Sequence, residues 1–196
     1  MGGTIDILGV DHEKEYRDLY SGWLGADHDV TTVSTGAAAI ESLTSETDLV
    51  LLERSLPDLS GRNVAASVHE SVDNCHVVMV SERPADFDIV EYPIESYVRK
   101  PLNGSDLDGI VERVETQQYY QSALEEYFRL LSKLGAIETE LSAEELSEDD
   151  RYERLQRRAE EKREEVDEAI STGDTDWHFT FKSTVQSGDH PAQASQ

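Results

Sequence analysis

Short apolar runs alternate with amphipathic segments over about the first 115 residues of the chain. Two of the runs are apolar on both faces, as the strands of a parallel sheet are. Between the runs, apolar residues recur at intervals of three and four, which predicts helices. The alternation predicts a doubly wound α/β sheet. Its strands are expected at residues 4–10, 29–34, 48–53, 76–81 and 96–100.

Polar residues stand at the ends of most of these runs. The carboxyl ends of parallel strands meet at one edge of a doubly wound sheet, and that edge is where such folds bind ligands. We therefore expect a functional site there. The polar residues at these strand ends are Asp11, His12, Glu53, Ser81 and Lys100.

The segments around these strand ends resemble the receiver domain of two-component response regulators. The matching segments are GVDHE, LLERSLPDLSG, VMVSER and YVRKP, after the first, third, fourth and fifth strands. The resemblance implies a flavodoxin-like, five-stranded parallel sheet with strand order 2-1-3-4-5. It also implies an aspartyl phosphate made with Mg²⁺ and a sensor histidine kinase as a partner.

The resemblance assigns a role to each strand-end residue by position. It places Glu53 at the phosphoacceptor, with Asp11 and His12 as the acidic pair that holds the metal. The remaining assignments are a hydroxyl switch at Ser81, a rotating aromatic at Tyr97, a phosphoryl-contacting lysine at Lys100 and a cis peptide bond before Pro101.

Two of these positions depart from the family pattern. Glu53 stands where the family has Asp, and His12 replaces a carboxylate. Mg²⁺ prefers oxygen ligands at about 2.0–2.1 Å, so imidazole is a poor substitute. A carboxylate one methylene longer moves the attacking oxygen by roughly an ångström, which can cost about 10²-fold in rate. We therefore expect no cofactor, a weak Mg²⁺ site at best on Asp11, and no enzymatic activity.

The sequence leaves three roles open for Glu53. Its carboxylate could reach toward Ser81 and Lys100 and partly imitate a phosphoryl group, with one charge instead of nearly two. It could instead form only an ion pair with Lys100 that holds the fold together. It could also still accept a phosphoryl group, which the retained Asp11, Ser81 and Lys100 favour.

The second half of the chain is predicted to be helical. Apolar residues follow a helical stripe from Leu107 to Leu134, with Gly135 expected to end the helix, and a capping box at 142–145 starts a further helical stretch. These features predict a C-terminal helical hairpin that could dimerise as a coiled coil, and they resemble the HalX-domain regulators of haloarchaea. The expected domains are a receiver at 1–117, the hairpin at 118–171 and a disordered tail at 172–196.

Charge and composition limit the classes of partner. The chain has 42 acidic and 17 basic residues, a net charge of −25, which opposes binding to nucleic acid. Such a surface suits molar salt, where the Debye length is about 3 Å. The basic stretch 151–163 is interleaved with acids, as in a solvated helix. The other histidines show no metal-ligand spacing; they are His28, His69, His76, His178 and His190.

No secretory signal or membrane-spanning stretch is recognisable, and the single cysteine, Cys75, suits a reducing compartment, so the predicted location is cytoplasmic. The leading hypothesis is a phosphorylation-independent signalling module that acts through protein partners, such as a sensor kinase or the transcription machinery, and that can form a homodimer. The alternatives are a phospho-accepting response regulator and a transcription regulator that contacts DNA through residues 140–170.

Overall fold

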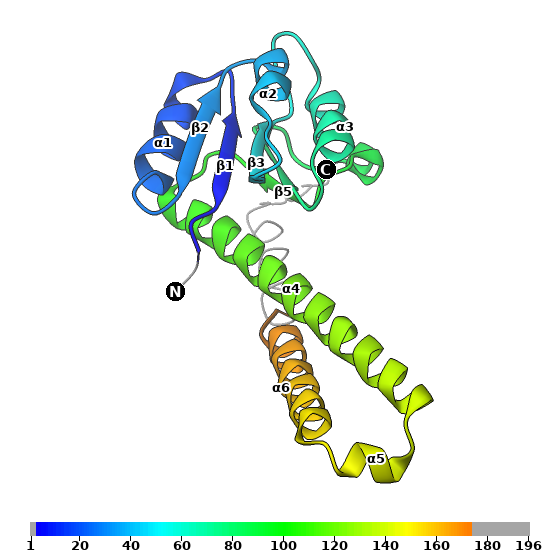
Figure 1. Ribbon diagram of the computed structural model, residues 1–196. Coiled ribbons are helices and arrows are strands. Elements are labelled where there is room, and N and C mark those ends of the chain that lie inside the picture. The colour runs from blue at the N-terminus through cyan, green and yellow to red at the C-terminus, as the bar shows by residue number, and fades with distance from the viewer. Residues whose placement is uncertain (1–2, 174–196) are drawn as a thin grey trace, which may run out of the picture. The chain divides into compact units, whose positions relative to one another are not determined.

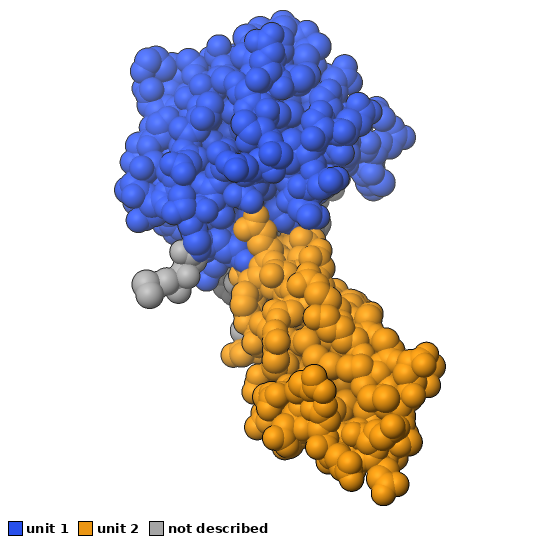
Figure 2. Space-filling view, in the orientation of Figure 1, with its two compact units in different colours: residues 1–115 blue, residues 116–196 orange. Residues whose placement is uncertain are grey.

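The computed structural model describes residues 3–173 of the chain. It divides into two compact units, Met1–Glu115 and Thr116–Gln196 (Figure 2). All but the first two residues of the expected 172–196 tail lie outside the described residues.

The first unit is built on five parallel strands in the order β2-β1-β3-β4-β5, as expected (Figure 1). Three helices, a short 3-10 helix and the start of a long helix connect or follow the strands. The strands are β1 (Asp6–Val10), β2 (Asp29–Val33), β3 (Thr47–Glu53), β4 (His76–Ser81) and β5 (Ser96–Arg99). The helices are α1 (Lys14–Leu24), α2 (Gly36–Ser42) and α3 (Gly61–Ser71), with the 3-10 helix η1 at Phe87–Glu91.

Alternating side chains of each central strand pack on opposite faces of the sheet, as the two-residue period of a strand requires. On one face, Leu49 and Leu51 pack with Tyr20 of α1 and Leu107 of the long helix α4 (Gly104–Glu140). The opposite face has its own core, which α2 and α3 cover; it includes Leu8, Val50, Leu52, Met79, Ala39 and Val64. The fully buried β3 and β4 explain why their sequences are apolar on both faces.

Strand register brings the polar strand ends to one level. Val10 of β1 is paired with Leu52 of β3, so the residue after β1 lies level with the end of β3. Ser81 is paired with Arg99 at the other side, so Lys100 follows directly beyond the end of β4.

Helix caps fix the loops that leave this edge of the sheet. The side chains of Thr35 and Ser60 accept hydrogen bonds at the N-termini of α2 and α3. Asp58, in the loop after β3, accepts hydrogen bonds from the backbone N–H groups of Gly36 and Ala37, both 2.8 Å long. These backbone hydrogen bonds lower the pKa of Asp58. The loop after β3 is therefore tied to the start of α2.

The segment between β4 and β5 forms little helix. It contains only η1, and Asp86 caps this short element by accepting a hydrogen bond from the N–H of Phe87. Pro84 and Pro93 flank η1 and have no N–H to donate, which limits the length of a helix here. Phe87 and Val90 of η1 are 92% and 81% exposed.

The second unit consists of helices. α4 runs to Glu140, so the expectation that the helix ends at Gly135 was wrong. Nothing crowds Gly135, and a single glycine costs only about 1 kcal/mol in a helix. The predicted capping box is present, with Ser142 and Glu145 bonding reciprocally at the start of α5 (Ala143–Ser147), and α6 (Asp150–Gly173) follows.

The hairpin of α4 and α6 has a small core. Its residues are Leu130, Leu134 and Ala159, with Tyr127, Tyr152 and Leu155 packed against them. Ion pairs join the same two helices, from Arg158 and Lys162 to Glu126. Within residues 3–173, no helix combines the length and apolar character needed to cross a membrane.

His76 makes the unfolding free energy of the protein sensitive to pH. It is 5% exposed, and its Nε2 has no hydrogen-bond partner within the described part of the chain. Burial lowers the pKa of His76; Glu95 and Asp48 oppose the shift, and His69 adds to it. Because the folded protein binds a proton less readily than the unfolded chain, stability is lost as pH falls below the ordinary histidine pKa of about 6.5.

We therefore expect His76→Phe to flatten the decline in unfolding free energy between pH 7 and pH 5. Urea unfolding at several pH values in molar KCl measures this. His69→Gln serves as the comparison, because His69 lies partly exposed beside Glu95. A decline as steep in His76→Phe as in the wild type would contradict the prediction.

Candidate functional site

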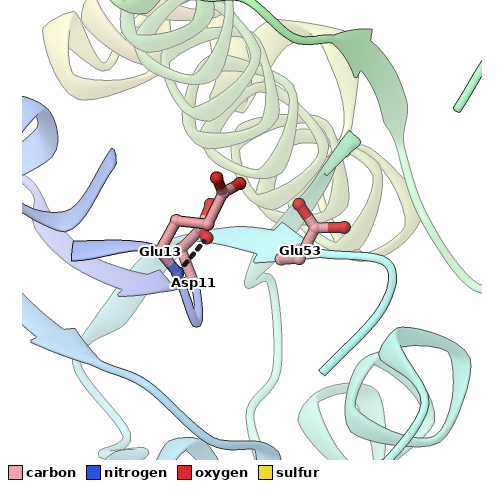
Figure 3. Close-up of side chains that lie close together, drawn as sticks. All are labelled: Asp11, Glu13 and Glu53. Carbon is pink, nitrogen blue, oxygen red and sulfur yellow. Dashed lines mark hydrogen bonds between the residues drawn. The ribbon is translucent and has the colours of Figure 1, made fainter. Parts of the chain in front are cut away.

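Lys100 lies at the centre of three carboxylates at the carboxyl edge of the sheet. Its Nζ is 2.8 Å from Asp11 Oδ2, 2.7 Å from Glu13 Oε1 and 2.7 Å from Glu53 Oε2. Figure 3 shows that the three carboxylates come from the ends of β1 and β3 and gather in one place. Asp11, Glu53 and Lys100 are buried, at 0%, 4% and 5% exposed, whereas the Glu13 side chain is 36% exposed.

The turn after β1 places Asp11 and Glu13 together. Asp11 Oδ1 accepts a hydrogen bond of 2.9 Å from the backbone N–H of Glu13, drawn dashed in Figure 3. The Arg17 guanidinium donates to the backbone carbonyls of Asp11 and His12, which holds the turn from outside. Glu13 then forms the N-cap position of α1, with its side chain directed to Lys100.

The end of β5 positions Lys100. Its backbone N–H donates to the Ser81 carbonyl, and a cis peptide bond joins it to Pro101. The Nζ also lies 3.9 Å from the centre of the Tyr16 ring, a cation–π contact. Burial alone would lower the pKa of Lys100, but the close contacts with the carboxylates of Asp11, Glu13 and Glu53 outweigh burial and raise it. The three carboxylates therefore favour the charged form of Lys100.

Glu53 is held by its own loop and by Lys100. Its Oε1 accepts a hydrogen bond of 3.0 Å from the backbone N–H of Ser55. Its Oε2 is in ion-pair contact with Lys100 but has no partner with hydrogen-bond geometry within residues 3–173. One oxygen of Glu53 thus keeps unused hydrogen-bonding capacity inside a buried site.

The structure places Ser81 and Tyr97 on the neighbouring strands. Ser81 is buried, and its Oγ accepts a hydrogen bond from the backbone N–H of Arg83. The Tyr97 ring packs against the core on the α2 and α3 face, and its hydroxyl donates to the Arg83 carbonyl at 2.9 Å. Both side chains therefore bind the loop after β4, and they link it to β4 and β5.

Glu13 is the site residue that sequence reasoning missed. His12, expected in the acidic pair, has a side chain that is 49% exposed, with Nδ1 3.9 Å from Asp11 Oδ1. Glu13 supplies the second carboxylate instead, and its hydrogen bond with Lys100 lowers the pKa of Glu13. The available signal was the spacing: in a tight turn after a strand, the residue two positions after Asp11 can return to the same side.

Carboxylate oxygens of Asp11, Glu13 and Glu53 lie within 4.8 Å of one another, close enough to share one metal ion. Such a donor set fits the hard cation Mg²⁺. However, the Lys100 ammonium already contacts all three carboxylates. A divalent cation would have to share these ligands with a positive charge that is part of the chain.

Comparison with known proteins identifies both halves of the chain. The response regulator receiver domain model matches residues 7–112, and the HalX domain model matches residues 116–182. A protein of Haloferax volcanii named "Putative transcriptional regulator" is 33% identical over 165 residues. That match includes 84% of this chain but only 28% of the relative, so the chain spans less than a third of the relative's length.

Solved structures show the same fold. The response regulator DrrB of Thermotoga maritima, an OmpR/PhoB homologue, is 26% identical with a TM-score of 0.52, covering 56% of this chain and 52% of its own. A CheY-like receiver domain protein of Methanospirillum hungatei is 23% identical with a TM-score of 0.52, covering 59% and 98%. Such domains are found in signalling and regulatory proteins. The chain belongs to the response regulator receiver family, and a HalX domain follows its receiver domain.

Proposed function

We propose that this response regulator works without phosphorylation and transmits its signal through protein contacts. The observation that carries the proposal is the ion pair of 2.7 Å between Glu53 and Lys100. In the receiver family this lysine contacts the phosphoryl group. Here the carboxylate at the acceptor position occupies that partner already, so the lysine is bound in the absence of any phosphoryl donor.

The chemistry of phosphoryl transfer is poorly supported at this position. An attacking carboxylate must be free to approach the phosphorus, but Glu53 is held by Ser55 and Lys100. The metal-binding carboxylates are also engaged with Lys100, which reduces their attraction for Mg²⁺. Both effects reduce the rate of the same step, in addition to the misplacement that the longer side chain introduces.

Tyr97 connects β5 to an exposed part of the receiver domain. The Tyr97 hydroxyl is bonded to the Arg83 carbonyl, and the loop that contains Arg83 leads into η1. η1 presents Phe87 and Val90 to solvent. A partner protein that binds the surface of η1 and β5 would therefore need no prior change in the conformation of that surface.

Protein contacts are favoured over DNA contacts for the helical unit. Arg163 of α6 pairs with Glu160 and Asp167, and Lys162 pairs with Glu165. Cations bound to neighbouring carboxylates add little to phosphate binding. The name of the Haloferax relative nevertheless favours transcription as the process regulated.

The proposal is tested with acetyl phosphate and Mg²⁺ in molar KCl, read by intact mass. We expect no added phosphoryl group on the wild type or on Glu53→Gln, and little on Glu53→Asp. The double variant Glu53→Asp/His12→Asp should gain one, since it regains the family's acceptor and the family's carboxylate at position 12. A phosphoryl group on the wild type that Glu53→Gln removes would show that the protein is a working phosphoacceptor.

A further inference from the structure

Three arginines gather around one pocket beside the receiver site. The pocket has a volume of about 440 Å³ and lies between the loop after β3 and the loop after β4. Its lining residues include Arg54, Arg62 and Arg83 and a single acidic residue, Asp58. The receiver unit has 23 acidic residues but only eight basic ones, so a positively charged pocket stands out in it.

Of the three arginines, Arg54 is paired with Asp88, whereas Asp58 forms no ion pair with an arginine within residues 3–173. Both oxygens of Asp58 accept hydrogen bonds from the N-terminus of α2. Arg83 is exposed, and its guanidinium forms no ion pair within the part of the chain that the structure describes. The ion pair of Arg62 with the exposed Glu91 is 3.5 Å long, and such surface pairs are worth little.

Tyr92 and Asp88 fix the geometry of the arginines. The guanidinium carbons of Arg54 and Arg62 lie 5.7 and 5.8 Å from the centre of the Tyr92 ring. Arg54 is also paired with Asp88, and its side chain is only 13% exposed. Two of the three guanidinium groups are thus held by the same ring, which limits the loss of side-chain entropy on binding a ligand.

We propose that this pocket binds a phosphoryl group non-covalently, carried by a small molecule or by a phosphorylated side chain. Guanidinium groups bind phosphate oxygens through paired, charge-assisted hydrogen bonds. Ser60, the N-cap residue of α3, lines the same pocket, and the positive end of the helix dipole favours an anion there. The volume leaves room for a phosphoryl group together with part of its carrier.

Binding of a phosphoryl group in this pocket would affect the surface of η1 and β5 without phosphorylation of Glu53. The Arg83 carbonyl accepts a hydrogen bond from the Tyr97 hydroxyl, and Asp88, the partner of Arg54, belongs to η1. A ligand that drew Arg54 and Arg83 together would shift the loop after β4 and the start of η1. The pocket lining includes neither Glu53 nor Lys100, so this inference stands apart from the proposed phosphorylation independence.

Isothermal titration with inorganic phosphate in molar KCl tests the proposal, because high salt screens unspecific charge attraction. We expect saturable binding that Arg83→Gln and Arg62→Gln each weaken about tenfold or more. Both side chains are largely exposed, so these variants should keep the fold. Arg129→Gln removes the same charge from an exposed site in the helical unit and should have no effect.

Two further arms identify the source and the site. A phosphoserine peptide that binds more tightly than phosphate would show that the carrier is a protein, and equal binding would show that the phosphoryl group alone suffices. If acetate bound as tightly as phosphate, the assignment of a phosphoryl site would be overturned. Loss of phosphate binding in Glu53→Gln but not in Arg83→Gln would also overturn it. The proposal would likewise be overturned if neither inorganic phosphate nor the phosphoserine peptide bound to the protein.

Discussion

Replacing Lys100 by Met should lower the free energy of unfolding by about 3–5 kcal/mol, the usual cost of removing one partner from a buried ion pair. The substitution keeps an unbranched side chain, one heavy atom shorter, and removes its charge. It leaves Asp11 and Glu53, both buried, next to Glu13 with no cation between them. Lys133→Met, at an exposed position of α4, removes the same charge and should change the stability little.

Two additions to this experiment separate the electrostatic cause from a packing cause. Mg²⁺ should raise the urea midpoint of Lys100→Met more than that of the wild type, since the three carboxylates can then share a metal without competition. Adding Glu53→Gln to Lys100→Met should recover part of the lost stability, because one buried charge is gone. Equal midpoints for Lys100→Met and Lys133→Met would show that the carboxylates do not depend on Lys100.

Gly61→Ala should destabilise the protein by about 1–3 kcal/mol, the range for overpacking a tight contact. A Cβ at this position would lie 2.8 Å from the Glu53 carbonyl oxygen and 2.9 Å from the Arg54 Cα. These are backbone atoms, so no side chain can rotate to relieve the clash. The N–H of Gly61 also donates to the Arg54 carbonyl at 2.9 Å, and displacement of α3 would break this bond.

Gly22→Ala provides the matched control. Gly22 lies in α1, where a Cβ would have no neighbour within 4 Å. Alanine is favoured over glycine in a helix by about 0.8–1.0 kcal/mol, so this variant should be more stable than the wild type. Opposite signs for the two substitutions, read from urea unfolding, are expected. A Gly61→Ala variant as stable as Gly22→Ala would mean that the loop after β3 can move away from Glu53 freely.

The fold was predictable because its central strands, β3 and β4, are almost entirely buried. Such positions favour apolar residues, so β3 and β4 were recognisable from the sequence without any knowledge of their partners. The end of α4 was not predictable, because whether a helix ends or continues at Gly135 depends on a free-energy difference of about 1 kcal/mol. A capping box further along then decides where the next helix begins.

The site residues at the strand ends were predictable from the sequence, whereas the residue that the turn after β1 contributes was not. Strand register brings Asp11, Glu53 and Lys100 together, and the end of each apolar run indicates where its strand ends. Which of His12 and Glu13 faces Lys100 depends on the backbone of a turn fixed by Arg17 and by the start of α1. The arginine pocket was also missed, since Arg54, Arg62, Arg83 and Tyr92 are scattered along the chain and only the fold brings them together.

Lys100 supplies the positive charge of the site from within the same chain, in place of a dissolved cation. A dissolved cation occupies a carboxylate cluster in proportion to its concentration, and a chelator can remove it. A cation attached to the same chain has an effective concentration that dilution does not change. The charge balance around Glu53 is therefore independent of metal supply, and the receiver keeps one electrostatic state while the ionic composition around it varies.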